Sequence, residues 1–250
     1  MISRRSQDEI EKIDQSCRAV RTILAELDRM VEPGITTADL DAHAERRARE
    51  FGGRAAFKGY MGYPASLCAS INEQVVHGIP RDVELRAGDM ISLDFGVLID
   101  GYYGDAAITC LVGEVSEVDE RLSRVTRECL LAAIERVSPG SRVSDIGHAV
   151  ESHATAAGFG VVREFVGHAI GTRLHEEPQI PNFGPPGRGA EIEEGMVLAI
   201  EPMITAGKPA VRVLSDGWTA VTRDGSRAAH WELVAAATSN GPRVLGETRT

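Results

Sequence analysis

The stretch Met90–Ile108, MISLDFGVLIDGYYGDAAI, predicts a β-hairpin that carries two aspartates. Alternating apolar residues on both sides favour two strands, and Asp100-Gly101 is typical of a two-residue hairpin turn. With that turn, Asp105 lies opposite Gly96. Because side chains alternate between the two faces of a strand, Asp94 and Asp105 become diagonal neighbours on one face. Their backbones would lie roughly 7–8 Å apart, with the side chains closer.

Two carboxylates that converge beside an apolar sheet repel each other and are costly to bury without a counter-charge. A cation between them would remove that cost, so the hairpin indicates a metal site. The alternative is that one aspartate belongs to a turn and the other to a solvated edge. The hairpin alone leaves both interpretations open.

The composition is that of an ordinary folded chain. At 250 residues it can bury a sizeable core, and 43% hydrophobic with 26% charged residues is typical of globular proteins. The net charge of −10 argues against a broad nucleic-acid-binding surface, because polyanions bind basic surfaces. We therefore expect no nucleic-acid partner.

The cysteines and the amino-terminal sequence indicate the compartment. Cys17, Cys68, Cys110 and Cys129 show no CxxC motif, so reduced thiols are favoured over disulfides. The amino-terminal residues lack the apolar run of a signal peptide, and no stretch is long enough to span a bilayer. We expect a cytoplasmic protein with no membrane partner.

Four segments have the apolar spacing of amphipathic helices. The first covers residues 6–30, and the second is capped by Thr37 and ends near residue 50. The third covers 123–137, and the fourth is capped by Ser144 and ends at Gly158.

A weak internal repeat links the two halves. VEPGITTADLDAHAE from Val31 and VSPGSRVSDIGHAVE from Val137 share Val, Pro, Gly and Asp positions 106 residues apart. LRAGDMISLD and IEEGMVLAIE, which end at Asp94 and Glu201, follow at an offset of 107. The period is too long for a solenoid, and chance recurrence of Pro-Gly turns is the alternative.

A duplicated unit predicts one α+β domain over residues 1–250, with halves at about 6–112 and 117–240. An antiparallel sheet covered by helices would enclose a central cleft, because each half must bury its sheet against the other. Asp94 and Glu201 would then face each other across the cleft.

Four acids and one histidine lie within apolar strands or just beyond them: Asp94, Asp105, His168, Glu201 and Glu232. We place Glu232 in the closing strand of a second hairpin, residues 218–237, around Asp224-Gly225. Acidic residues are seldom buried without a partner, and carboxylates with one imidazole suit Mn, Fe, Co or Zn. Taken singly, His168 could be a core histidine and Glu232 an edge charge.

Several motifs resemble those of the type I methionine aminopeptidases. They are GYMGYPASLCASINEQVVHGIP, LDFGVLIDGYYGDAA, VGHAIGTRLHEEPQI, LAIEPM and the Glu232 strand, spread from about Ser6 to Thr238. The resemblance implies the pita-bread fold with its pseudo-two-fold duplication. It also implies hydrolytic removal of the initiator methionine from nascent proteins and peptides by a metal-bridged hydroxide.

The resemblance further implies two divalent metal ions, Co, Mn, Fe or Zn. Asp105 and Glu232 would bridge them, Asp94 would chelate one, and His168 with Glu201 would hold the other. Paired metals lower the pKa of a shared water toward ~7, which supplies hydroxide at neutral pH.

The same resemblance assigns catalytic roles to three residues. Glu201 would carry a proton to the leaving amine, since it lies beside the metals. His175 would donate to the oxyanion, and His77 would hydrogen-bond near the scissile nitrogen. One metal would take the free amino terminus, so that only the terminal residue is removed.

The implied substrate pocket has an apolar, polarizable lining that fits a thioether. The matching positions are Phe57, Tyr60, Tyr63, Cys68, His77, Leu174 and Trp218. All of these except His77 could instead be ordinary core. The chain departs from the family at Leu233 and Met61, where histidine is common, and at Phe57 and Leu174, where cysteine and phenylalanine are usual.

Two other functions stay open. An Xaa-Pro aminopeptidase or dipeptidase shares the fold and ligands but normally has an added amino-terminal domain, whereas the first helix here begins within the first ten residues. A non-catalytic binding module shares the fold but typically loses ligands. For the favoured function we expect a monomer, a partner peptide or nascent chain that begins with Met, and transient ribosome association.

Overall fold

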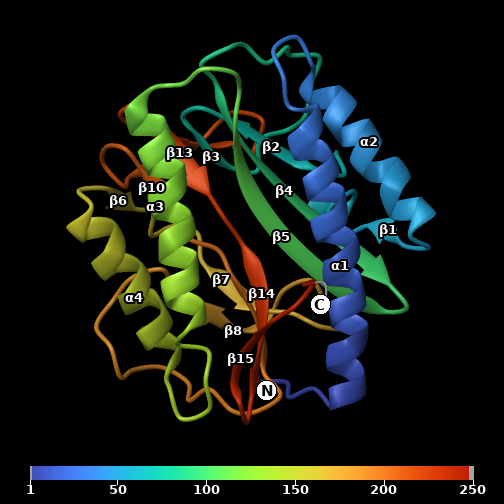
Figure 1. Ribbon diagram of the computed structural model, residues 1–250, viewed down its shortest axis with the longest axis vertical. Coiled ribbons are helices and arrows are strands. Elements are labelled where there is room, and N and C mark those ends of the chain that lie inside the picture. Colours follow the sequence, from blue (N-terminus) through green and yellow to red (C-terminus); the bar gives the residue numbers. More distant parts are fainter. Residues whose placement is uncertain (1, 248–250) are drawn as a thin grey trace.

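The computed structural model describes residues 2–247. The helices in this part of the chain are α1 Gln7–Met30, α2 Thr37–Glu50, α3 Glu117–Ile134 and α4 Val143–Ala156. They form two pairs, α1 with α2 and α3 with α4, that lie on one side of the strands (Figure 1). No helix among residues 2–247 combines the length and apolarity needed to cross a bilayer.

Three helix starts differ from the sequence prediction. Thr36, not Thr37, caps α2, because its hydroxyl accepts from the N–H of Asp39 at 3.1 Å. Arg142, not Ser144, is the N-cap of α4, and its N–H donates to Asp145 at 2.7 Å. Helix α3 begins six residues earlier than expected, because Ser116 caps it.

The predicted aspartate hairpin is present as β4 Met90–Ile99 and β5 Tyr102–Leu111. Its register pairs Gly96 with Asp105, as the turn predicts. Asp100 and Gly101 both have positive φ, 48° and 82°, which is the geometry that a tight hairpin turn requires. Helix α1 packs directly on β5, since a Cβ at Gly104 would lie 2.5 Å from the backbone of this helix.

A four-stranded sheet is built on this hairpin, and a five-stranded sheet lies beside it. The first has the order β1 (Arg54–Ala55), β4, β2 (Cys68–Ile71), with β5 paired to β4. The second has the order β15 (Gly241–Val244), β14 (Leu233–Thr238), β9 (Val197–Ile200), β7 (Gly167–Ala169), β8 (Glu176–Ile180). A β-bridge between Ala107 and Glu232 joins the two sheets.

The predicted hairpin at residues 218–237 is wrong. Its two segments belong to different three-stranded sheets, because each finds a partner distant in the sequence. Strand β12 (Ala220–Thr222) pairs with β11 (Val211–Val213) and β3 (Gln74–Val76). Strand β13 (Ala228–His230) pairs with β10 (Met203–Thr205), which also pairs with β6 (Gly160–Val161). Glu232 lies just before β14 rather than inside it.

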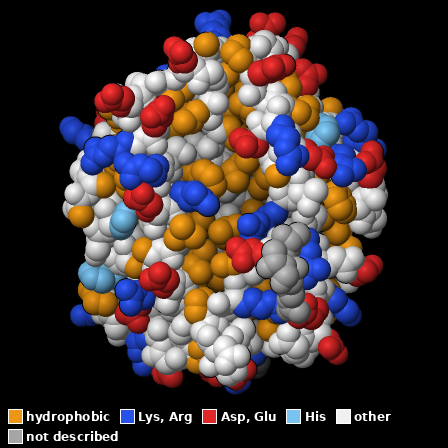
Figure 2. All heavy atoms as spheres, in the orientation of Figure 1, with side chains coloured by type: hydrophobic (Ala, Val, Ile, Leu, Met, Phe, Trp, Pro, Cys, Tyr) orange, Lys and Arg blue, Asp and Glu red, His pale blue; other side chains and the backbone are white. Residues whose placement is uncertain are grey.

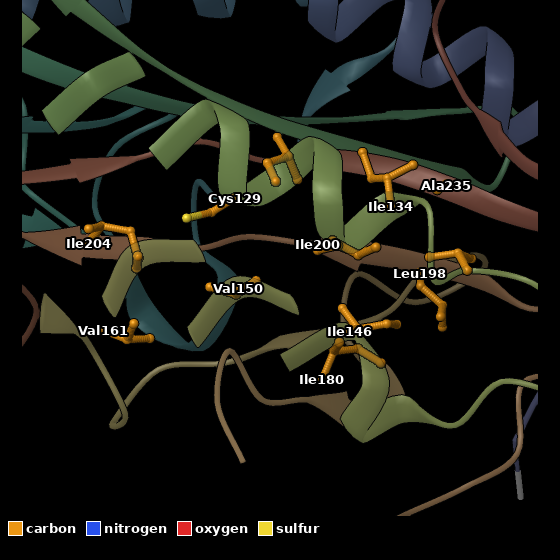
Figure 3. Packing of buried hydrophobic residues seen from close by; sticks show 14 of the residues in the cluster. Cys129, Ile134, Ile146, Val150, Val161, Ile180, Leu198, Ile200, Ile204 and Ala235 are labelled. Atoms are coloured by element: carbon orange, nitrogen blue, oxygen red, sulfur yellow. The ribbon is translucent and has the colours of Figure 1, made fainter. Parts of the chain in front are cut away.

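Each helix pair buries its own apolar core. Figure 3 shows α3 and α4 packed on the five-stranded sheet, with Ile134 of α3 and Ile146 of α4 beside Leu198 of β9 in one apolar cluster. A second core fills the space between α1, α2 and the hairpin. Between α1 and α3, apolar side chains line a surface groove of about 310 Å³ over β5 (Figure 2). None of the four cysteines forms a disulfide.

A candidate metal centre and its cleft

Strand pairing brings the four acids and His168 to one cavity of about 180 Å³. Asp94 and Asp105 share a face because Gly96 pairs with Asp105. On the other sheet, His168 pairs with Ala199, so Glu201 lies two residues along on the same face. The Ala107–Glu232 bridge then places Glu232 beside Asp105, with N···O distances of 2.9 and 3.3 Å.

The donor atoms of this cluster fit a cation. Ligand atoms of Asp105, His168 and Glu232 lie within 4.8 Å of one another. Oδ1 of Asp94, Oδ1 of Asp105 and Oε1 of Glu232 are buried without a hydrogen-bond partner among residues 2–247. Buried carboxylate oxygens without donors are costly, and a divalent ion satisfies several at once.

The ring of His168 is held by a backbone carbonyl, with Nε2 on the side of Glu201. Its Nδ1 lies 3.1 Å from the carbonyl oxygen of Ala169, so Nδ1–H donates there and Nε2 keeps its lone pair. Nε2 lies 3.6 Å from Oε1 of Glu201. A backbone carbonyl that fixes the ring in this way is the usual support of a metal-bound histidine.

The pKa shifts of the clustered acids also indicate that this site needs a compensating positive charge. Burial raises the pKa of Asp94 to about 7. Burial and neighbouring carboxylates hold the pKa values of Asp105 and Glu232 well above their usual range. Burial also lowers the pKa of His168 to about 3, so the imidazole is neutral. A cation is what allows these acids to be ionised together at neutral pH.

Every residue predicted for the substrate pocket lines this cavity: Phe57, Tyr60, Tyr63, Cys68, His77, Leu174 and Trp218. The Tyr63 hydroxyl donates to the carbonyl of Gly78 at 2.9 Å, and its ring contacts Trp218 edge-on with centroids 5.1 Å apart. Gly96 leaves room for Phe57, since a Cβ there would lie 2.8 Å from that ring. The walls are therefore apolar and closely packed.

Two of the family departures lie in different places, Met61 at the edge of this cavity and Leu233 outside it. Met61 lines it but is 81% exposed, and its φ is 50°. Leu233 instead lines the surface groove between α1 and α3. Met61 therefore alters the rim and Leu233 the opposite side of the sheet.

His175 and His77 flank the acids. The His175 ring lies 4.2 Å from the His168 ring, centroid to centroid, and its Nδ1 lies 2.9 Å from the hydroxyl of Tyr60. His77 contacts Phe165 and Trp218 edge-on, and burial lowers its pKa to about 4. Its φ of 61° is uncommon for a residue with a side chain, and such strain clusters at functional sites.

His230 is a site residue that sequence reasoning missed. It is 1% exposed, and its Nε2 lies 3.7 Å from Oε2 of Glu201 without a hydrogen bond among residues 2–247. The backbone N–H of His230 donates to the hydroxyl oxygens of Ser92 and Thr109, at 3.2 and 3.0 Å. The available signal was a histidine two residues before Glu232 in an otherwise apolar run.

Arg5 was also missed. Its Nη2 lies 2.6 and 2.5 Å from the two carboxylate oxygens of Glu176, which directly follows His175. Both side chains are buried, at 10% and 3% exposed. No periodicity or motif pairs residues 171 positions apart, so only the fold shows this contact.

A second hollow, of about 430 Å³, shares His77, His168, His175 and Glu201 with the cavity. The half-buried Phe165 and the exposed Arg173 are among the other residues that form its walls. It offers space for a chain that continues beyond the cavity.

The sequence and the structure match known proteins along nearly their whole length. Residues 11–234 match metallopeptidase family M24. A methionine aminopeptidase of Clostridium acetobutylicum is 46% identical over 246 residues, which is 98% of each chain. Methionine aminopeptidase 1 of Bacillus subtilis is 44% identical and covers 98% of this chain and 99% of its own.

The structural comparison agrees. The crystal structure of a methionine aminopeptidase from Thermotoga maritima superposes with a TM-score of 0.97 at 44% identity, covering 99% of this chain and 100% of that one. A prolidase from Pyrococcus furiosus has a TM-score of 0.79 at 20% identity, and the match covers 66% of its chain. At that identity the prolidase shares the fold only.

Proposed function

This chain belongs to metallopeptidase family M24, and from that premise we propose that it is an aminopeptidase that removes the N-terminal methionine of peptides and proteins. The observation that carries the proposal is the single cavity in which four acids and His168 adjoin an apolar pocket. An aminopeptidase needs both parts, one for hydrolysis and the other for selecting the side chain.

Asp94, Asp105, His168, Glu201 and Glu232 would hold two divalent ions, of Co, Mn, Fe or Zn. When bound, such ions lower the pKa of water and polarise a carbonyl group, and they thereby supply a nucleophile at neutral pH. The unsatisfied oxygens of Asp94, Asp105 and Glu232 support this assignment. Ligand atoms of Asp105, His168 and Glu232 lie within 4.8 Å of one another, which supports a shared place for these three residues in the metal site.

Three residues of the chain act on the substrate. His175 donates a hydrogen bond to the carbonyl oxygen as that oxygen gains negative charge. Glu201 passes a proton to the leaving nitrogen, since its carboxyl group faces the cavity beside His168. His77 hydrogen-bonds near the scissile nitrogen from the wall shared by the cavity and the outer hollow.

The pocket selects methionine by size and polarizability. Buried walls at Phe57, Tyr63, Cys68 and Leu174 surround a space suited to an unbranched thioether. The free amino terminus lies toward the carboxylates, so only the terminal side chain reaches the pocket. The rest of the substrate leaves through the outer hollow.

The cellular setting follows from this substrate. Initiator methionine is carried by chains that emerge from the ribosome in the cytoplasm, so we place the protein there, with transient ribosome association. The cavity is formed by one chain, which is compatible with a monomer.

A peptide panel tests the proposal. The protein is stripped of metal with a chelator, reloaded with Co²⁺, Mn²⁺, Fe²⁺ or Zn²⁺, and assayed on Met-Ala-Ser and Ala-Pro-Ser. We expect hydrolysis of Met-Ala-Ser only after reloading. Preference for Ala-Pro-Ser would favour an Xaa-Pro peptidase, and inactivity with every ion would favour a binding module.

A further inference from the structure

Tyr60 and His175 meet at the rim of the cavity although they lie 115 residues apart. The Tyr60 oxygen is 2.9 Å from Nδ1 of His175, and the rings contact edge-on with centroids 5.1 Å apart at 80°. Because Nδ1 is engaged by Tyr60, Nε2 is the nitrogen that His175 has left for a substrate.

The direction of this hydrogen bond decides what His175 can do. A neutral imidazole carries one proton, and the bond made by one nitrogen sets the state of the other. If the tyrosine hydroxyl donates to Nδ1, then Nε2 carries the proton and can donate to a carbonyl oxygen. If Nδ1–H donates to the hydroxyl, then Nε2 has only a lone pair and cannot donate.

The hydrogen-bond geometry favours the tyrosine as donor. Nδ1 of His175 is the one hydrogen-bond partner of the Tyr60 hydroxyl among residues 2–247, so this nitrogen is the acceptor available for the hydroxyl proton. Burial and the neighbouring Tyr103 also raise the pKa of Tyr60, so its hydroxyl keeps that proton. We propose that Tyr60 is a positioning residue whose hydroxyl donates to Nδ1 of His175 and holds this histidine in the Nε2–H form. The proposal rests on the proposed function of His175 as a donor.

The backbone holds both partners in place. Residues on each side of Tyr60 have positive φ, 83° at Gly59 and 50° at Met61, and the N–H of Tyr60 donates to the Phe57 carbonyl at 2.9 Å. The second partner is held through Glu176, which follows His175 and is paired with Arg5. A hydrogen bond between two fixed side chains is already formed before the substrate arrives.

Nitrogen-15 NMR of the metal-free protein tests the tautomer directly. The histidine side chains are labelled and observed at pH 8, and the His175 signals are assigned by their loss in His175→Gln. We expect a protonated Nε2 and an unprotonated Nδ1 in the wild type. We expect a mixture of the two tautomers in Tyr60→Phe, which removes only the hydroxyl. A protonated Nδ1 in the wild type would overturn the proposal.

Kinetics of the metal-loaded protein give the second readout. Removing a donor to an oxyanion costs about 10²–10³-fold in kcat, so partial loss of the correct tautomer in Tyr60→Phe should lower kcat about 10-fold on Met-Ala-Ser, with KM changed less than about twofold. Tyr102→Phe is the matched control, because the Tyr102 hydroxyl contacts Glu9 of α1 at 3.4 Å and does not line the cavity. We expect wild-type kinetics for this control.

The two readouts separate this proposal from the proposed function. An unchanged tautomer and an unchanged kcat in Tyr60→Phe would overturn the role of Tyr60 while leaving the aminopeptidase intact. Absence of methionine release by the wild type would overturn the function, yet the NMR spectrum would still identify the nitrogen that carries the proton. If Tyr60→Phe fails to fold, the wild-type NMR spectrum alone tests the proposal, because it shows which nitrogen of His175 carries the proton.

Discussion

Asp94 shows how much of the site depends on one side chain. It lies diagonal to Asp105 on the hairpin, and its Oδ1 has no donor among residues 2–247. No donor among the described residues therefore offsets the burial of this oxygen. A cation is the partner that the geometry implies.

Asp94→Asn keeps the shape of this side chain but removes its charge. Loss of supporting groups around a metal already costs about 10–100-fold, so loss of a ligand should lower activity at least about 100-fold. Thermal unfolding of the metal-free variant should occur at or above the wild-type temperature, because a repelling carboxylate is gone. Asp100→Asn, in the exposed turn of the same hairpin, is the control and should keep wild-type activity. An active Asp94→Asn enzyme would contradict the ligand assignment.

Leu174 tests the pocket at the same scale. It is 2% exposed and lines the cavity, so Leu174→Ala should lower the free energy of unfolding by about 2–5 kcal/mol and raise KM for Met-Ala-Ser. Leu131→Ala, at a position 45% exposed, should change stability by less than about 0.5 kcal/mol. Denaturant unfolding and steady-state kinetics check both. Equal effects of the two substitutions would argue against a packed pocket wall.

At the scale of elements, local signals predicted the hairpin but not the distant contacts. Strand alternation and the Asp100-Gly101 turn fix the register of β4 and β5 within 22 residues of sequence. The segments around Asp224 have the same kind of turn, yet they pair with strands elsewhere, and no local pattern identifies a remote partner. The predicted starts of three helices were wrong by one to six residues, because the N-cap residues are Thr36, Ser116 and Arg142.

The amino-terminal arm before α1 supports the loop that carries His175. The N–H of Arg5 donates to the Gly195 carbonyl at 2.7 Å, and its guanidinium pairs with Glu176. The loop backbone is tied to the same carboxylate, since the N–H of Arg173 donates to it at 3.1 Å. The arm thus stabilises a loop 170 residues away.

Arg5→Met should be strongly destabilising. Removing one partner of a buried ion pair leaves an uncompensated charge, here on Glu176, and typically costs about 3–5 kcal/mol of unfolding free energy. Arg4→Met removes an exposed pair with Glu193, 57% and 51% exposed, and should cost less than about 1 kcal/mol. Urea unfolding of both variants compares them. Similar midpoints would show that the buried pair does not stabilise the loop.

At the scale of the whole molecule, two pairs of positions in the two halves match. Asp39 and Asp145 both lie at the third position of a helix, 106 residues apart, and each bonds the backbone of its N-cap. Gly34 and Gly140, at the same offset, have φ of 98° and 91°. We propose that residues 6–112 and 117–240 are copies of one unit within a single catalytic domain. The cavity would then lie where the copies meet.

The sequence identified the cavity residues better than their surroundings. Acids in apolar strands are conspicuous, so Asp94, Asp105, Glu201 and Glu232 could be found without a structure. The outer hollow could not, because it arises from strands and loops that meet only after folding. The position of His230 two residues before Glu232 was a signal in the sequence, but its place beside Glu201 depends on the fold. Sequence motifs therefore identify the residues with reactive side chains, whereas the contacts that support them depend on how distant segments pack.

Metal removal should weaken the whole fold. An ion that binds only the folded state stabilises it by mass action, by about 2.7 kcal/mol at 100 times the dissociation constant. We expect chelation to lower the unfolding temperature and added Mn²⁺ or Co²⁺ to restore it. If neither chelator nor added metal changed the unfolding temperature, the result would contradict a metal centre that neutralises the buried acids.

The central claim is that four carboxylates and one imidazole converge because a pair of divalent ions binds between them. Calorimetric titration of the metal-free protein with Mn²⁺, checked by elemental analysis, measures this directly. We predict two ions per chain for the wild type and a loss of at least one tight site in Glu232→Gln. Absence of binding, or the same stoichiometry and affinity in Glu232→Gln, would contradict the claim.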